Sequence, residues 1–206
     1  IPVGHATGAD MFGGGRVEGQ MDPREALEIL KPMLEDRSIL KVGHNMKYDL
    51  GILGWHGVRI EGPFFDTMIA HALVEPELRH GMDYLSGALL GYTPTPTDRL
   101  IGPKGGGQRS MAEVPVEQAA EYAAEDADLC QRLHAVLYPQ IVADAGLARV
   151  YAEIEIPVRD ILFRMERHGV LIDGELLTRQ SHEIGKRLLD LEARAHAAAG
   201  QPFNVN

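Results

Sequence analysis

The chain has 206 residues, of which 45% are hydrophobic, and a formal net charge of −10 at pH 7. This hydrophobic fraction is ample for a core, and the length suits one large domain or one domain plus part of another. The negative charge argues against non-specific duplex binding through a basic face, although an acidic site can act on nucleic acid where metal ions neutralise its carboxylates. No apolar run is long enough to span a membrane, so no membrane partner is expected.

The first part of the chain predicts a loop, a helix and a strand. Residues 1–3 look like the end of a strand that enters a Gly-rich loop reaching about Gly19. Asp22 followed by Pro23 is typical of a helix start, because Asp caps the first turn and Pro suits the first helical position. Residues 39–43 are a short apolar run after a polar turn and predict a strand.

Helices dominate the middle of the chain. Asp66 is a suitable N-cap, and Gly57 and Gly91 are suitable helix ends. The predicted elements here are a helix opened by Asn45, a possible strand at 58–60, a helix from 66 to about 74 and a helix at 82–90.

Residues 92–115 are rich in Pro and Gly and predict a loop. A long helical pattern follows, and the character of the sequence changes after Gly146. The order of strands and helices predicts an α/β domain over residues 1–146, whose first strands are missing from the chain, and the beginning of a second domain over 147–206. The second part is expected to hold helices at 149–168 and 174–199, joined by an extended link.

Cys130 is the only cysteine, so no intramolecular disulfide can form. A single free thiol fits a reducing compartment such as the cytoplasm. Because Cys130 lies in a helical pattern, we interpret it as a small core residue and not as a nucleophile.

Two pairs of polar residues are spaced four apart in helical patterns. They are Asn45 and Asp49 in GHNMKYD, and Tyr122 and Asp126 in EYAAEDAD. Residues four apart lie on one face of a helix, so each pair places a carboxylate beside a hydrogen-bonding partner. Carboxylate oxygens suit Mg²⁺ or Mn²⁺, and two helices that face each other would bring the two Asp side chains to one metal site.

This interpretation has plain alternatives, because NxxxD and YxxxD occur by chance in many helices. Asn45 could act only as a helix N-cap, and Tyr122 could be a core aromatic residue with a hydrated hydroxyl. The pairs alone therefore leave the function open.

The wider sequence resembles a known family. The segments KVGHNMKYDLGIL, FDTMIAHAL and EYAAEDADLCQRLH resemble the 3′–5′ proofreading exonuclease domain of bacterial family A DNA polymerases, in the tyrosine subgroup of the DEDD superfamily. RHGMDYLSGALLG resembles the segment after the second motif, and ERHGVLIDGELL and AGQPFNVN resemble the base of the polymerase thumb. The resemblance implies a ribonuclease H-like fold with a mixed sheet flanked by helices.

The resemblance also implies roles for individual residues. Asp49 matches the second-motif Asp, reached by metal through water, and Asp126 matches the third-motif Asp, a direct metal ligand. Tyr122 matches the residue that positions the nucleophile, and Asn45 matches the Asn of the second motif. The residues expected near the DNA strand are Arg79, Lys104, Gln108 and Arg109.

The family's first motif, Asp-x-Glu, is not matched in this chain, and the match begins downstream of it. We therefore expect a piece of a longer protein, with two Mg²⁺ or Mn²⁺ ions in the complete domain and little activity in the piece itself. His44 stands where the family often has Gln. The expected partners are a single-stranded 3′ end and a primer–template, and the parent protein is expected to be a monomer.

Two other functions remain open from the sequence. One is an inert scaffold that keeps the exonuclease fold, although retention of Asn45, Asp49, Tyr122 and Asp126 argues against it. The other is an RNA-trimming exonuclease of the same superfamily. The thumb-like segment RMERHGVLID argues against that function, since an RNA enzyme would be followed by a helical RNA-binding domain.

Overall fold

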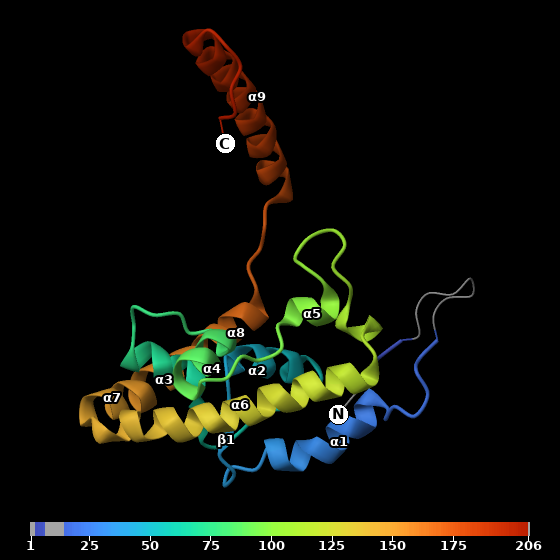
Figure 1. Cartoon of the computed structure of the whole chain (residues 1–206), viewed down its shortest axis with the longest axis vertical. Coiled ribbons are helices and arrows are strands. Elements are labelled where there is room, and N and C mark those ends of the chain that lie inside the picture. Colours follow the sequence, from blue (N-terminus) through green and yellow to red (C-terminus); the bar gives the residue numbers. More distant parts are fainter. Residues whose placement is uncertain (1–2, 7–14, 206) are drawn as a thin grey trace. The chain divides into compact units, whose positions relative to one another are not determined.

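The computed structural model describes residues 3–6 and 15–205. Residues 1–2, expected to end a strand, and residues 7–14 of the predicted Gly-rich loop lie outside the described residues. The chain divides into two compact units, Ile1–Arg167 and His168–Asn206, which are described separately below (Figure 1).

The first unit is mainly helical, with one small sheet. Its strands are β1 (Lys41–Gly43) and β2 (Phe64–Asp66). Its helices are α1 (Pro23–Leu34), α2 (Met46–Trp55), α3 (Thr67–Val74), α4 (Met82–Leu90), α5 (Thr97–Ile101), the 3₁₀ turn η1 (Met111–Glu113), α6 (Val116–Ala143), α7 (Ala145–Val150), the π-helical segment η2 (Tyr151–Glu155) and α8 (Ile156–His168).

The two strands form a parallel pair in which Lys41 faces Phe64 and Gly43 faces Asp66. Apart from one antiparallel bridge, Ala6–Arg16, this pair is the whole sheet within the described residues. The α/β class is confirmed. A strand forms within the predicted segment 39–43, but only from Lys41 onward.

The strand predicted at residues 58–60 is wrong, and the second strand begins six residues later, at Phe64. The turn before β2 explains the shift. Gly62 has a φ of +97°, and a Cβ there would lie 3.0 Å from the backbone oxygen of Asp36. Only Gly fits this crossing, so the chain has to complete the turn before it can pair with β1.

The predicted loop at 92–115 contains two short helices, which the prediction missed. Pro96 has extended backbone angles and starts α5, and Ser110 and Glu113 form a reciprocal capping box around η1. The long helix predicted to about residue 145 ends at Ala143, because the Asp144 side chain accepts from the amides of Gly146 and Leu147 and starts α7.

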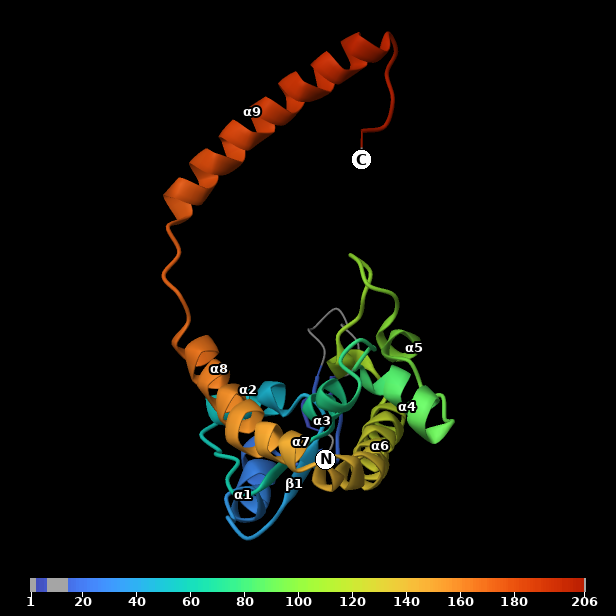
Figure 2. The same ribbon diagram turned by 90° about the vertical axis from the view of Figure 1, so that its left-hand side faces the viewer.

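α6 supplies the largest part of the core. Leu129, Leu133, Leu137 and Ile141 recur every four residues and are at most 3% exposed, so one stripe of α6 is buried. The last three residues of this stripe belong to one core cluster with Phe65 of β2, Ala70 of α3, Leu85 of α4 and Tyr151 of η2. α6 therefore contacts α3, α4, α7 and β1, as the two ribbon views show (Figures 1 and 2).

α8 packs on the back of α2 and β2 within the first unit. The buried Arg159 guanidinium lies 4.2 Å from the centroid of the Phe64 ring, and Arg167 lies 4.8 Å from that of Trp55. Glu166 forms an ion pair with Lys47 of α2. These contacts attach α8 to both α2 and β2.

The second unit consists of an extended link and one helix, α9 (Gly174–Ala199), which confirms the two elements predicted there. The Asp173 side chain caps α9 at the amide of Leu176. No α9 residue is buried, and apolar side chains such as Leu188 and Leu189 are more than half exposed. No helix among the described residues has both the length and the apolar character needed to cross a membrane.

Replacement of Leu133 by Ala tests the α6 stripe. Leu133 is fully buried, so Leu133→Ala should lower the free energy of unfolding by about 2–5 kcal/mol through lost contacts and a residual cavity. Val142→Ala, at a half-exposed position on the same helix, should change it by less than about 0.5 kcal/mol. Urea unfolding followed by the fluorescence of Trp55, the only tryptophan, measures both variants. Equal losses would contradict the stripe.

Candidate active site

A pocket of about 550 Å³ opens where β1, α1, α2 and α6 meet. Its floor and walls are mostly apolar and include Met33 of α1, Val42 of β1 and Leu53 of α2. Asp49 of α2 and Asp126 of α6 both line it. Two carboxylates that are 77 positions apart in sequence therefore reach one concave space because their helices flank the same strand.

The surroundings of both carboxylates disfavour their charged forms. Asp49 is solvent-exposed at the pocket rim, yet the protein atoms around it remove enough water to raise its pKa, and Asp66 adds to the rise. Burial also raises the pKa of Asp126, partly opposed by the Tyr122 hydroxyl. Glu125 and Asp83 raise the pKa of Asp126 further. A cation in this pocket would stabilise the charged forms of both carboxylates and so lower their pKa values.

Tyr122 lies one helical turn before Asp126 and is partly buried. Its hydroxyl hydrogen-bonds the Thr97 hydroxyl of α5 at 3.0 Å. Burial raises the pKa of Tyr122, and the nearby Asp126 and Asp83 carboxylates raise it too, so the phenol stays protonated near neutral pH. A protonated phenol can orient a water molecule by hydrogen bonding.

Asn45 occupies the N-cap position of α2, but its side chain makes no capping hydrogen bond. Its φ of 57° is the only positive value at a non-glycine residue among the described residues. Left-handed backbone costs about 1–3 kcal/mol at most non-glycine residues and less at Asn, and it persists where neighbouring groups hold it. The Asn45 side chain is exposed, so it is available to a substrate.

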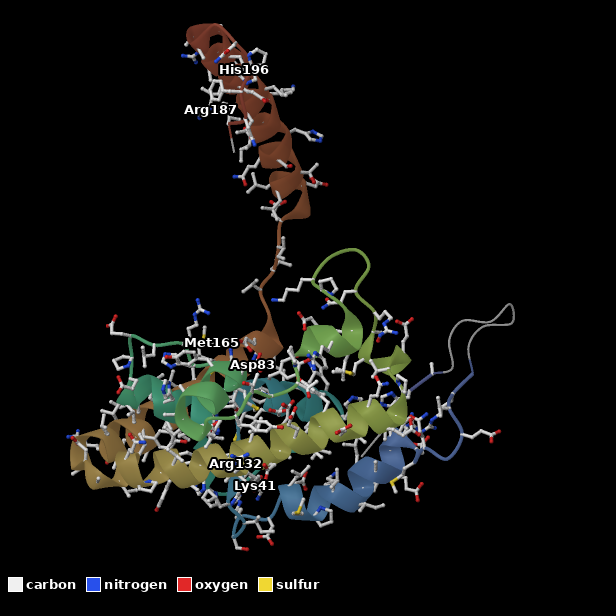
Figure 3. The ribbon with its side chains drawn as sticks, in the orientation of Figure 1. Lys41, Asp83, Arg132, Met165, Arg187 and His196 are labelled. Atoms are coloured by element: carbon white, nitrogen blue, oxygen red, sulfur yellow. The ribbon has the colours of Figure 1, made fainter. Side chains whose placement is uncertain are left out.

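The structure adds three residues that the sequence did not single out. Asp83 of α4, labelled in Figure 3, lies close enough to raise the pKa values of Tyr122 and Asp126. Thr97 contacts Tyr122. Asp66 was interpreted only as a helix cap, but it also accepts from the amide of Asn45 at 3.1 Å. Sequence spacing carries no signal for contacts between such distant positions.

The expected substrate-binding residues lie outside the pocket lining. Arg79 is exposed in the turn between α3 and α4, where the neighbouring His80 hydrogen-bonds His71 of α3 at 2.8 Å. The His71–His80 hydrogen bond therefore fixes the turn that carries Arg79.

Lys104, Gln108 and Arg109 are exposed on the loop after α5. Arg109 donates to the Leu100 carbonyl at 2.7 Å, and Gln108 donates to the Gly102 carbonyl at 3.2 Å. These two side chains would have to leave the carbonyls of their own loop before they could contact a phosphate.

The donor chemistry of the pocket fits a hard divalent cation, since Asp49 and Asp126 offer carboxylate oxygens. Within the described residues, however, no group of three or more His, Cys, Asp or Glu side chains is arranged to hold a metal. The pocket of the described chain thus supplies two acidic ligands.

A sequence profile of the 3′–5′ exonuclease family of family A DNA polymerases matches residues 8–142. The chain belongs to this exonuclease family. DNA polymerase I of Rhizobium leguminosarum is 40% identical over 207 residues, which cover 100% of this chain and 20% of the relative. DNA polymerase I of Pseudomonas aeruginosa is 40% identical over 192 residues, which cover 92% of this chain and 21% of the relative. The exonuclease chain spans about a fifth of the length of these curated relatives.

Solved structures agree with this family. NrnC of Brucella melitensis, bound to pGG, is 29% identical with a TM-score of 0.53, over 76% of this chain and 71% of that one. The same protein with bound Mg²⁺ gives 26% identity and a TM-score of 0.51, over 76% of this chain and 71% of that one. A Pol1 structure from M. smegmatis, in complex with DNA primer-template and dNTP, shares the fold, with a TM-score of 0.57 at 22% identity over 91% of this chain and 29% of that one. The predicted exonuclease fold is confirmed.

Cys130 gives a chemical test of the pocket wall. Burial raises the pKa of its thiol to about 11, with Asp126 adding to the rise, so at pH 8 only about one molecule in a thousand carries a thiolate. A disulfide reagent such as DTNB should react with the folded chain at least about a hundredfold more slowly than with the chain in guanidinium chloride. Similar rates in the two conditions would show that the thiol is not held in this wall.

Proposed function

We propose that the chain is part of a DNA polymerase I and contributes to a metal-dependent 3′–5′ exonuclease that removes 3′-terminal nucleotides from DNA for proofreading. The observation that carries this proposal is the arrival of Asp49 and Asp126, from two separate helices, at one pocket of a chain in this family. Template-directed synthesis would belong to the rest of the protein, because the chain covers only about 20% of its relatives.

Each side chain has a role that its position supports. Asp126 would bind a metal ion directly, and Asp49 would bind it through water. Two bound Mg²⁺ or Mn²⁺ ions would activate a water molecule and neutralise charge on the phosphodiester. The Tyr122 hydroxyl, set one turn from Asp126, orients the attacking water, and the exposed Asn45 side chain contacts the substrate.

A single-stranded 3′ end is the best substrate for this site. The pocket lining is mostly apolar, and the bases of an unpaired end can pack against such a surface, whereas paired bases are held in the duplex stack. Arg79 is exposed on the turn before α4, and Lys104, Gln108 and Arg109 are exposed on the loop after α5. All four are proposed to contact phosphates. On this proposal the complete protein works as a cytoplasmic monomer on a primer–template.

The domain assignment stays a proposal as well. Residues 1–146 would form the exonuclease domain, and residues 147–206 would begin the polymerase domain. The exposed apolar side chains of α9 are consistent with a helix that packs against further protein.

An inert exonuclease-fold scaffold is the main alternative. A second is an enzyme that acts on dinucleotides, because one solved relative is bound to pGG. The substrate panel therefore includes labelled single-stranded DNA, the matching RNA and a dinucleotide. Metal-dependent cleavage of the dinucleotide but not of the longer strands would favour the second alternative, and no cleavage would favour the first. Trimming of RNA but not DNA would contradict the proposed DNA substrate.

Asp126→Asn in the full-length polymerase should reduce excision from single-stranded DNA by at least about a hundredfold, because a neutral amide binds Mg²⁺ far less well than a carboxylate. Polymerisation should be unchanged. Tyr122→Phe should cause a smaller loss, since it removes an orienting hydroxyl and not a ligand. A labelled 3′ end with Mg²⁺ or Mn²⁺ measures both reactions.

Asp128→Asn is the matched control. Asp128 lies on the same helix two residues later, is exposed and pairs with Arg132 at 3.6 Å. This variant should keep full excision. If excision survived in Asp126→Asn, or fell equally with polymerisation, the assignment of Asp126 to a separate nuclease site would be wrong.

The 206-residue chain by itself should fold but bind metal weakly and not trim DNA. Two carboxylates, one acting through water, hold Mn²⁺ poorly, and we expect a dissociation constant on the order of 10⁻⁴–10⁻³ M, as in the weakest oxygen-ligand sites. The net charge of −10 also repels phosphate. Calorimetric titration with Mn²⁺ and an assay on a labelled strand test both points. Tight binding together with steady trimming would contradict the two-ligand interpretation.

A further inference from the structure

Asp66 lies at the point where two strands end and two helices begin. β1 and β2 are parallel, with Gly43 opposite Asp66, so both strands end at the same edge. α3 starts directly after β2. α2 starts at Met46, three residues after the end of β1, with Asn45 as its N-cap residue. The Asp66 side chain is 1% exposed and therefore faces protein on all sides.

The Asp66 carboxylate accepts from the first turns of both helices. Oδ1 accepts from the amides of Met68 at 3.0 Å and Ile69 at 3.4 Å, which caps α3. Oδ1 also accepts from the Asn45 amide at 3.1 Å, and Oδ2 accepts from the Met46 amide at 2.8 Å. A single N-cap serves one helix, whereas this carboxylate joins two.

The backbone of Asp66 is fixed as well. Its amide donates to the Tyr151 hydroxyl at 2.7 Å, in the buried core beneath the site. Asp66 is therefore held through β2 and η2 as well as through the two helices that its carboxylate contacts.

The α2 contacts act on the strained start of that helix. Asn45 has left-handed backbone and no side-chain cap of its own, so the Asp66 oxygens are the groups that hold its amide and the next one. Such a conformation persists only where its surroundings fix it. Asp49 lies on the same helix, three residues after Met46, so its place at the pocket depends on this start.

We infer that Asp66 is a positioning residue of the nuclease site: its carboxylate, shared between the first turns of α2 and α3, fixes Asn45 and aims the helix that carries Asp49. Asp66 does not line the pocket and contacts no reacting group. This inference rests on the proposed exonuclease function.

Asp66→Asn separates the two halves of the contact. The amide oxygen of Asn can keep the bonds to Met68, Ile69 and Asn45, and Asn is as good an N-cap as Asp, so α3 keeps its start. The amide nitrogen cannot accept from Met46, so a donor faces a donor where the wild type has a 2.8 Å bond. The reverse orientation would oppose more amides and is worse.

In the full-length polymerase, Asp66→Asn should lower kcat for excision by about 10–100-fold and raise the Mn²⁺ concentration needed for half-maximal rate, with little change in KM for single-stranded DNA. The matched control is Asp144→Asn, because Asp144 caps α7 away from the pocket with bonds to Gly146 and Leu147. It should leave kcat and the Mn²⁺ requirement unchanged. A loss of stability alone would reduce active protein without moving the Mn²⁺ requirement.

Hydrogen exchange gives a readout that does not depend on catalysis. In Asp66→Asn the amides of the first turn of α2 should exchange at least about tenfold faster, while those of Met68 and Ile69 stay protected. Unchanged exchange in α2 would overturn the inference whatever the activity. Faster exchange with unchanged excision would overturn it too. If wild-type polymerase shows no metal-dependent excision, the proposed function fails, while the exchange result still decides whether Asp66 holds α2.

Discussion

The burial of one stripe along α6 is the constraint on which the rest of the first unit depends. Leu129, Leu133 and Leu137 are fully covered by the sheet and by helices on both sides, so α6 cannot rotate without exposing them. Asp126 lies one turn before Leu129, at the end of the same face. The hydrophobic effect therefore sets the direction of a charged side chain, because rotation that would turn Asp126 away from the pocket would also bring leucines into water.

The candidate site lowers the stability that this core provides. Asp49 and Asp126 are partly desolvated, and no cationic side chain among the described residues lowers the pKa of either, which is unfavourable for their charged forms. The strained Asn45 adds to the cost. Such local conflicts are typical of functional positions, since a residue that served only the fold would be selected for lower strain. The free energy that offsets these local costs comes from the core that α6 builds and from the contacts of α8 with α2 and β2.

Periodicity and capping chemistry predicted α1, α3, α4 and α9 well, because their signals are local. The strand at 64–66 could not be separated from the apolar residues at 58–60 in this way, since the deciding feature is a crossing of Gly62 over the backbone of Asp36. At the site, family resemblance selected Asp49 and Asp126. The cap role of Asp66 could be predicted, because a helix cap is visible in four consecutive residues. Its second role could not, because the hydrogen bond to Met46 joins positions twenty residues apart.

The contacts that residues beyond position 142 make with β2 have a consequence for evolution and engineering. The family match ends at residue 142, yet Tyr151 supplies the partner of the Asp66 amide and Arg159 covers Phe64. A chimaera joined at residue 142 would leave a buried amide without its hydroxyl and an aromatic ring without its cover. The natural seam for exchanging this nuclease between polymerases lies after Arg167, where the first compact unit ends. The segment matched by the family profile is therefore shorter than the unit that folds.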